Sequence, residues 1–262
     1  MDARKVESLF AQTLVGDYEG EDGWKAVTAL RQDGSREIFS YAAAWCSSDD
    51  PLKRARAAAV LCQLRRAPTT SELAERPEWV FRGETYLLVT RMLENEQDPL
   101  VLDSAISALG HLDNVEAVPL ILRYTGHPDE GVRFSVAFAL GCFPNNDDAI
   151  KGLLILTLDP DEDVRDWAVF GLGVQGDVDS PEIREALLRS LEDANVNVRE
   201  EAAVGLGKRR DQRLIPVLRA MLNEPELKVR VAEAAAALLG LDKDPPEWGA
   251  PDYKAALTSK FG

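Results

Sequence analysis

A short motif recurs along this chain at a spacing of just over thirty residues. A clear copy contains a Val-Arg step, a run of small apolar residues and a closing Leu-Gly, whereas the looser copies have Lys53 in place of Val or Leu102 in place of Arg. The four clearest copies place the arginine at Arg133, Arg165, Arg199 and Arg230, which gives spacings of 32, 34 and 31 residues. Two looser copies begin at positions 50 and 98. Self-similarity at this period is typical of repeat proteins, in which each unit packs against its neighbours.

The segments between these motifs carry apolar residues at helical spacing. In one of them Ile183, Leu187 and Leu191 share a helix face. Ser180 and Pro181 stand where an N-cap and a first-turn proline are favoured. No run of Val, Ile and Thr alternates as a strand would. The sequence therefore predicts an all-α fold, an α-solenoid in which antiparallel helical hairpins stack into a superhelix with a concave side.

The ends of the chain depart from the repeat. Residues 1–48 hold an amphipathic start and a degenerate hairpin, which predict N-terminal capping helices. Residues 49–240 hold the repeats, and a long insertion at 67–80 interrupts the first of them. Residues 241–262 predict a C-terminal cap or tail. Terminal repeats deviate in this way because one of their faces meets water. The insertion either shields a groove edge or loops out.

The formal net charge of the chain is −15. Proteins that bind nucleic acid neutralise the phosphates with Lys and Arg, so this charge disfavours nucleic acid and, equally, an anionic membrane surface. It favours a protein partner with a basic or mixed surface. No stretch approaches the roughly 20 apolar residues of a membrane helix, and the first residues lack the apolar region of a signal peptide. We therefore expect a cytoplasmic protein.

Two smaller features have ordinary structural interpretations. One local basic cluster is predicted to be mostly a solvated helix face; its members are Lys53, Arg54, Arg56, Arg65 and Arg66. The three cysteines are Cys46, Cys62 and Cys142. They are far apart and form no CxxC pair, which argues against a disulfide framework and against a structural zinc site.

Motifs of enzyme active sites are missing from the sequence. There is no glycine-rich phosphate loop, no HExxH and no nucleophile elbow. The two histidines, His111 and His127, are not followed by Glu, as paired metal-binding steps would require. His127 precedes a proline and is predicted to be a turn or cap residue. We therefore expect a protein that is not an enzyme and that holds no metal and no cofactor.

The repeated motifs resemble the HEAT-like repeats named after phycobilisome lyases, and the consensus proteins designed from that family. The resemblance covers about 49–240 and implies the solenoid fold. It also implies that the Val-Arg arginines form a structural ladder with acids near the turns of neighbouring hairpins. Arg133, Arg165, Arg199 and Arg230 match that position. Because the family serves many tasks, the resemblance implies little about function.

The resemblance further implies which positions on each Val-Arg helix face the groove. They are the two residues after the arginine, the residue three further on and the residue after the closing glycine. In the copies at 98, 128, 160 and 194 these positions hold Asp103, Ser104, Ser107 and His111; Phe134, Ser135, Phe138 and Cys142; Asp166, Trp167, Phe170 and Val174; and Glu200, Glu201, Val204 and Lys208.

Four aromatic rings stand at these positions, where solvation would favour polar residues. The two members of each ring pair, at 134 and 138 and at 167 and 170, share a helix face. An aromatic patch with a charged rim is typical of a protein interface, and acids favour a partner rich in Lys and Arg. The predicted partner-binding residues are Phe134, Phe138, Trp167, Phe170, Asp166, Asp103, Glu200, Glu201 and His111. Two alternatives are that the register is off by one, so that the rings are core, and that neighbouring helices cover them.

These observations favour a non-catalytic protein-binding module, which would serve as an adaptor, an assembly factor or an inhibitor of a basic partner. An immunity protein against a cationic toxin belongs to this class. A second hypothesis is a bilin-lyase-like factor that holds a tetrapyrrole and a client protein. A third is recognition of a DNA lesion, as in HEAT-like glycosylases, which the acidic charge disfavours.

Overall fold

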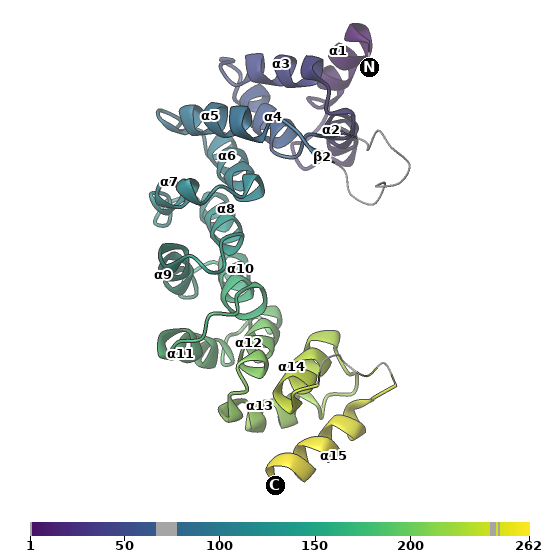
Figure 1. Cartoon of the computed structure of the whole chain (residues 1–262), viewed down its shortest axis with the longest axis vertical. Coiled ribbons are helices and arrows are strands. Elements are labelled where there is room, and N and C mark those ends of the chain that lie inside the picture. The colour runs from purple at the N-terminus through teal and green to yellow at the C-terminus, as the bar shows by residue number, and fades with distance from the viewer. Residues whose placement is uncertain (1, 67–77, 242–244, 246) are drawn as a thin grey trace. The chain divides into compact units, whose positions relative to one another are not determined.

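The structure is a computed structural model that describes residues 2–66, 78–241, 245 and 247–262 (Figure 1). Two short strands interrupt an otherwise helical chain within those ranges. The predicted all-α solenoid of stacked hairpins is confirmed. The chain divides into two compact units, residues 1–139 (unit 1) and 140–262 (unit 2). Each unit is described by itself.

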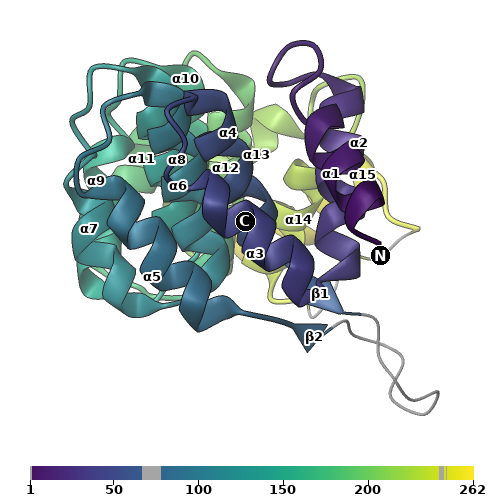
Figure 2. The same cartoon turned by 90° about the horizontal axis from the view of Figure 1, so that it is seen from above.

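Unit 1 begins with three helices within residues 1–48, where capping helices are predicted, and Figure 2 shows α1 and α2 side by side. The helices of the repeats follow, with the Val-Arg copies on α4, α6 and α8. The elements are α1 (Ala3–Gln12), α2 (Glu21–Asp33), α3 (Arg36–Trp45), α4 (Pro51–Leu61), β1 (Arg65–Arg66), β2 (Glu78–Trp79), α5 (Arg82–Leu93), α6 (Pro99–Leu112), η1 (Val115–Ala117), α7 (Val118–Leu122) and α8 (Glu130–Gly141), whose last two residues belong to unit 2.

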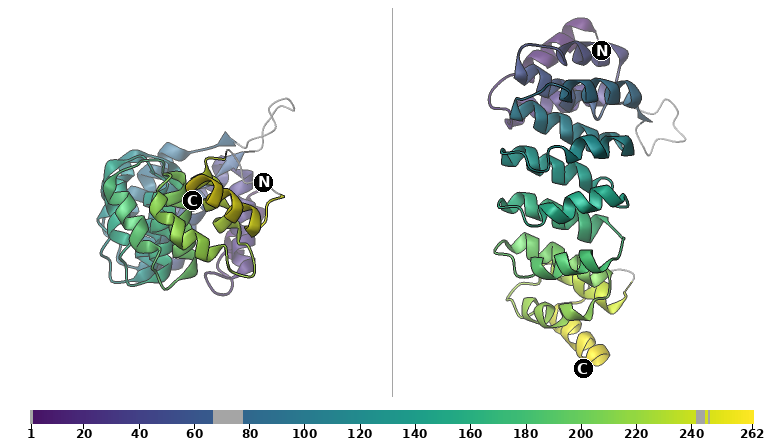
Figure 3. Two further views of the ribbon diagram at one scale, coloured as in Figure 1. Left: turned by 90° about the horizontal axis from the view of Figure 1, so that it is seen from below. Right: turned by 90° about the vertical axis from the view of Figure 1, so that its left-hand side faces the viewer.

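Unit 2 continues the alternation, with the Val-Arg copies on α10, α12 and α14. Within it the helices α9 and α11 lie one above the other (Figure 3, right). The closing helix lies within the predicted cap or tail of residues 241–262 and packs on α14. The elements are α9 (Asp147–Leu156), α10 (Glu162–Phe170), η2 (Gly171–Gln175), α11 (Pro181–Ser190), α12 (Val196–Lys208), η3 (Gln212–Leu214), α13 (Ile215–Met221), α14 (Val229–Leu239) and α15 (Ala250–Phe261).

Side-chain caps explain why several Val-Arg helices start where they do. Asp50 and Asp98 each accept a hydrogen bond from the backbone N–H two residues on, and each is followed by a first-turn proline. Asp161 caps α10 in the same manner. The carboxylate satisfies donors that the first helical turn leaves free, and it suits the positive end of the helix dipole.

The small residues of the motif allow the Val-Arg helices to approach closely. A Cβ atom at Gly205 in α12 would lie 2.6 Å from Gly173 Cα and 2.9 Å from a methyl group of Leu187. The segment that contains Gly173 is a π-helical turn, η2. The buried Arg209 side chain satisfies carbonyls there, donating to Leu172 O at 2.8 Å and to Val178 O at 2.6 Å.

Two arginines, Arg165 and Arg54, form the ladder that the family resemblance implies. Arg165 donates from Nε and Nη2 to both carboxylate oxygens of Asp193, at 2.7 and 3.0 Å, and from Nη1 to the carbonyls of Asp159 and Pro160. Arg54 makes the same bidentate pair with Glu96. Each guanidinium thus ties its own turn to an acid of the next hairpin.

Arg133 and Arg199 bind the carbonyls of their own turns in the same way. Arg133 Nη1 donates to His127 O and Pro128 O, and Arg199 Nη1 to Asp193 O and Ala194 O. The placement of Arg230 in this ladder was wrong. Because α14 begins at Val229, Arg230 is its second helical residue, and its guanidinium instead pairs with Glu201 and Glu233.

Two further sequence interpretations need correction. The basic cluster is not mostly solvated, because Arg54 belongs to the ladder and Arg56 is only 1% exposed. The expectation of no strand was wrong for β1 and β2, which pair antiparallel. These two strands flank the insertion, whose residues 67–77 lie outside the described part of the chain. Within the described residues the three cysteines form no disulfide.

The ladder leads to a stability prediction. Replacing Arg165 by Ala leaves the largely buried Asp193 carboxylate and two turn carbonyls without their donor. We expect the free energy of unfolding to fall by about 1–3 kcal/mol. Denaturant unfolding of the variant measures this change. Arg4→Ala, at an exposed position on α1, serves as the control, and an equal effect in both variants would contradict the ladder's role.

The close helix approach leads to a second prediction. Gly205→Ala introduces a methyl group where Gly173 and Leu187 leave no room, so we expect a loss of about 1–3 kcal/mol in the free energy of unfolding. The matched change is Gly83→Ala in α5, where an added Cβ meets nothing within 4 Å. Thermal melting of both proteins tests this, and a Gly205→Ala protein as stable as wild type would disprove the close packing.

Candidate functional site

The predicted groove positions of unit 1 lie together on α6 and α8. We call this surface the unit 1 face. Ser107 Oγ donates to Ser135 Oγ at 3.1 Å, and Ser135 Oγ in turn donates to the Asp103 carboxylate. Burial raises the pKa of Asp103, and the bond from Ser135 opposes this shift. The carboxylate is therefore bound within its own face, where a short polar network links neighbouring repeats.

His111 and Phe138 meet across the same face. Their ring centroids are 5.0 Å apart, in an edge-on arrangement. The Gln63 side-chain amide lies 3.1 Å from His111 Nδ1. Burial, followed by the nearby Arg31 charge, lowers the pKa of His111, so the imidazole is neutral at pH 7. Phe134 lies one turn before Phe138 on α8, and both rings are half-buried.

The N-terminal segment covers part of the unit 1 face. The Tyr18 hydroxyl hydrogen-bonds to Ser104 Oγ at 2.7 Å. Arg56 occupies the groove position of α4, two residues after Arg54, and its guanidinium lies 4.1 Å from the Tyr18 ring centroid and 5.2 Å from that of Trp24. Its Nε donates to Thr13 O at 2.8 Å. Burial lowers the pKa of Arg56.

This contact was not predicted from the sequence. Its one signal there is that Arg56 stands at a groove position of the first looser copy. The structure therefore shows that the chain's own residues already occupy the α4 and α6 end of the unit 1 face.

The groove positions of α10, α12 and α14 form the unit 2 face. Trp167 and Phe170 lie on α10 with ring centroids 5.5 Å apart and an interplanar angle of 79°. Both rings are half-buried. The Arg230 guanidinium of α14 lies 5.6 Å from the Phe170 ring centroid. Three neighbouring repeats thus contribute side chains to one aromatic and charged surface.

The predicted acids of this face differ in their partners. Glu200 is nearly buried and accepts a hydrogen bond from Lys228 Nζ at 2.6 Å. Glu201 Oε1 lies 3.0 Å from Arg230 Nε, whereas its Oε2 is buried without a hydrogen-bond partner among the described residues. Asp166 Oδ1 is also buried without a hydrogen-bond partner among the described residues. Lys228, Arg230 and Glu233 belong to this surface and were not predicted as site residues.

The pKa of Glu201 reflects its burial and the charged side chains around it. Burial raises its pKa to about 7, with further contributions from the Asp166 and Glu233 charges, and the Arg230 charge opposes the shift. Burial and the Asp163 charge also raise the pKa of Asp166. The unit 2 face therefore holds one carboxyl group that is partly protonated near neutral pH.

The predicted site residues thus fall into two groups. Asp103, His111, Phe134 and Phe138 belong to the unit 1 face, and Asp166, Trp167, Phe170, Glu200 and Glu201 belong to the unit 2 face. The rings are neither core nor fully exposed, because neighbouring side chains cover part of each one. Their role in binding a partner stays a prediction.

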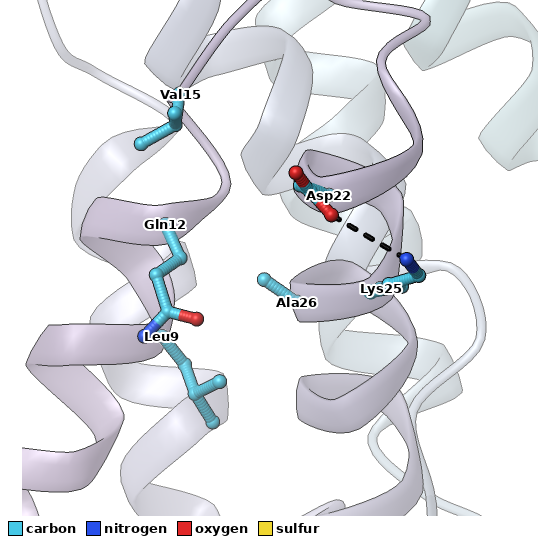
Figure 4. Close-up of a pocket in the computed structure, with 6 residues that line it drawn as sticks. All are labelled: Leu9, Gln12, Val15, Asp22, Lys25 and Ala26. Carbon is cyan, nitrogen blue, oxygen red and sulfur yellow. Dashed lines mark hydrogen bonds and ion pairs between the residues drawn. The ribbon is translucent and has the colours of Figure 1, made fainter.

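The described pockets lie away from these faces. One of 390 Å³ opens between α1 and α2, where Leu9, Gln12 and Val15 face Asp22, Lys25 and Ala26 (Figure 4). Another, of 460 Å³, lies between α3 and α5. In the ranges that the structure covers, no group of three or more His, Cys, Asp or Glu side chains is placed to hold a metal ion. No helix in those ranges is both long and apolar enough to cross a membrane.

Comparison with known families supports the repeat architecture. A family model described as HEAT repeats matches residues 87–173 and 150–239, which together make up more than half of the chain. Among curated proteins, YibA of Escherichia coli strain K12 is 26% identical over 232 residues, which cover 86% of this chain and 78% of YibA.

Solved structures show the same architecture. The crystal structure of Escherichia coli YibA superposes with a TM-score of 0.71 at 22% identity, covering 98% of this chain and 93% of that one. The complex of CpcE and CpcF of phycocyanin lyase from Nostoc sp. PCC7120 gives a TM-score of 0.51 at 17% identity, covering 97% and 94%. At these identities the likeness is one of fold.

The raised pKa of Glu201 predicts a pH dependence of stability. In the folded protein this carboxyl has a pKa of about 7, against 4.5 for an ordinary Glu. The stabilisation that the protonated carboxyl contributes to the folded protein is therefore fully present below about pH 4.5 and is lost as the pH rises to about 7. We expect the stability of wild type relative to Glu201→Gln to fall across that window, by on the order of 1–3 kcal/mol. Urea unfolding at a series of pH values measures this, with the exposed Glu192→Gln as the control. A flat difference would contradict the assignment.

Proposed function

Because this chain belongs to the HEAT-repeat family, we propose that it is a non-catalytic protein-binding scaffold, an adaptor or an inhibitor. Its Val-Arg helices bind a partner protein with a basic or mixed surface. The unit 1 face contributes Phe134, Phe138, His111 and Asp103. The unit 2 face contributes Trp167, Phe170, Asp166, Glu200 and Glu201.

The observation that carries this proposal is the pairing of aromatic rings with carboxylates on the unit 2 face. Trp167 and Phe170 contact each other beside Asp166 and Glu201. Half-buried rings held by their neighbours lose little freedom when a partner covers them, and aromatic residues supply much of the binding energy in protein interfaces. The adjacent acids favour Lys and Arg on the opposing surface.

The acidic charge of the whole chain supports the same choice of partner. A net charge of −15 attracts a basic protein at long range and repels the phosphate backbone of nucleic acid. Two measurements separate this proposal from the other hypotheses. A bilin-lyase-like role predicts an absorbance shift when bilin is added, and DNA-lesion recognition predicts salt-sensitive binding to duplex DNA.

The proposal predicts the effect of placing charge on both faces. We expect Phe138→Glu combined with Trp167→Glu to abolish capture of the protein partner, because two rings that would enter the interface become charged. Helical content and melting temperature should stay close to those of wild type. The experiment is affinity capture with mass spectrometry, followed by measurement of the dissociation constant for the identified partner.

The matched control is Leu87→Glu combined with Ile155→Glu. These residues are 66% and 63% exposed and lie on α5 and α9, one in each unit. Partner binding should survive this change. If the face variant unfolds, the rings belong to the core; if it folds and still binds as wild type does, the partner docks elsewhere. Either result would refute the proposed interface.

A further inference from the structure

Arg230 departs from the pattern of the other repeat arginines. In α4, α8, α10 and α12 the arginine is the fourth helical residue, and its Nη1 donates to the carbonyls of its own turn. In α14 the helix starts later, so Arg230 is the second residue. Its Nη1 donates to Glu233 Oε2 at 2.8 Å instead. The change of register moves one guanidinium from the ladder to the unit 2 face.

The guanidinium rests among groups that suit this cation. Its Nε lies 3.0 Å from Glu201 Oε1 on α12, and its Cζ lies 5.6 Å from the Phe170 ring centroid on α10. A planar guanidinium gains from a carboxylate pair and from an aromatic face at the same time, which an ammonium group does less well. Three helices thus supply one built position for a guanidinium, and that position is occupied.

Arg230 does not satisfy all the acceptors around it. Asp166, Glu201 and Glu233 provide three carboxylates for this one guanidinium. Asp166 Oδ1 and Glu201 Oε2 are buried with no hydrogen-bond partner among the described residues. A buried acceptor without a donor is unfavourable, so the cluster has capacity for more donors than Arg230 supplies.

The exposures of the two side chains indicate which one moves. The Arg230 side chain is 33% exposed, whereas that of Glu201 is 12% exposed. The Arg230 side chain can therefore rotate into water while the Glu201 carboxylate and the Phe170 ring stay in place. Its departure costs little free energy when another guanidinium enters, because the incoming group re-forms the same contacts.

We propose that Phe170, Glu201 and Glu233 form a guanidinium-binding subsite that Arg230 occupies in the free protein, and that an arginine of the partner displaces it. This inference rests on the proposed function and names the chemistry of one contact within it. Arg230 acts as a competitor inside the chain. It neutralises part of the negative charge of the subsite, so an incoming cation binds only if it displaces Arg230.

The test measures binding of hexa-arginine amide and hexa-lysine amide by titration calorimetry at pH 8. We expect Arg230→Gln to bind hexa-arginine about fivefold more tightly than wild type does, because the competitor is gone. The gain in affinity for hexa-lysine should be less than about half as large. Arg189→Gln on α11 makes the same change in net charge away from the site, and its affinity for hexa-arginine should rise less than about twofold.

A second substitution locates the effect. In Arg230→Gln combined with Glu201→Gln, the gain for hexa-arginine should disappear. If Arg230→Gln does not fold, Arg230→Lys replaces it, and a gain of about twofold is expected because Lys fills the subsite less well. The proposal is overturned if Arg189→Gln raises the affinity for hexa-arginine as much as the Arg230 variant does, or if the Arg230 variant gains as much affinity for hexa-lysine as for hexa-arginine. It is also overturned if the gain in hexa-arginine affinity persists when Glu201 is replaced as well.

Failure of this inference is distinguishable from failure of the proposed function. If the partner binds through Phe138 and Trp167 but loss of Arg230 changes no peptide affinity, the scaffold function stands and the subsite does not. If the subsite behaves as expected but no protein binds the two faces, the subsite stands without the scaffold function.

Discussion

The bidentate arginine of the Val-Arg step is the interaction on which the rest of the structure depends. A guanidinium at the fourth residue of its helix binds carbonyls of its own turn and, at Arg54 and Arg165, the carboxylate of the next hairpin. The bond ties each of these two helices to its own turn and to the next hairpin, and the capping carboxylates set where the helices start. Once the start is fixed, residues one, two and five positions after the arginine reach the same face in successive repeats.

The two units use this arrangement for different chemistry. On the unit 1 face the groove positions form a polar network, and the chain's own Tyr18 and Arg56 already occupy one end. On the unit 2 face Trp167, Phe170 and Glu201 leave acceptors without donors and a carboxyl with a pKa of about 7. The same repeat architecture thus presents a hydrogen-bonded polar network in one unit and, in the other, an aromatic surface with carboxylate oxygens that lack a donor among the described residues.

The sequence was sufficient for the architecture because several copies of one motif agree on helix period, caps and turns. The family resemblance gave the predicted groove positions relative to Arg133 and Arg165, and a role for those positions in binding stays a prediction. The sequence could not reveal Arg56 and Arg230 as face residues. The spacing from proline to arginine is the same at Arg165 and Arg230, yet α14 starts two residues later relative to its arginine. Burial of Arg56 depends on Thr13 and Tyr18, which are distant in sequence.

The central claim is that the Val-Arg helix faces, and not the helices that pair with them, contact a protein partner. Site-specific photo-cross-linking tests it most directly, with p-benzoylphenylalanine at Phe170 in one protein and at the 63% exposed Ile155 of α9 in another. The account predicts a cross-link from position 170 to a protein with a basic surface and none from position 155. Cross-links from 155 alone would contradict it.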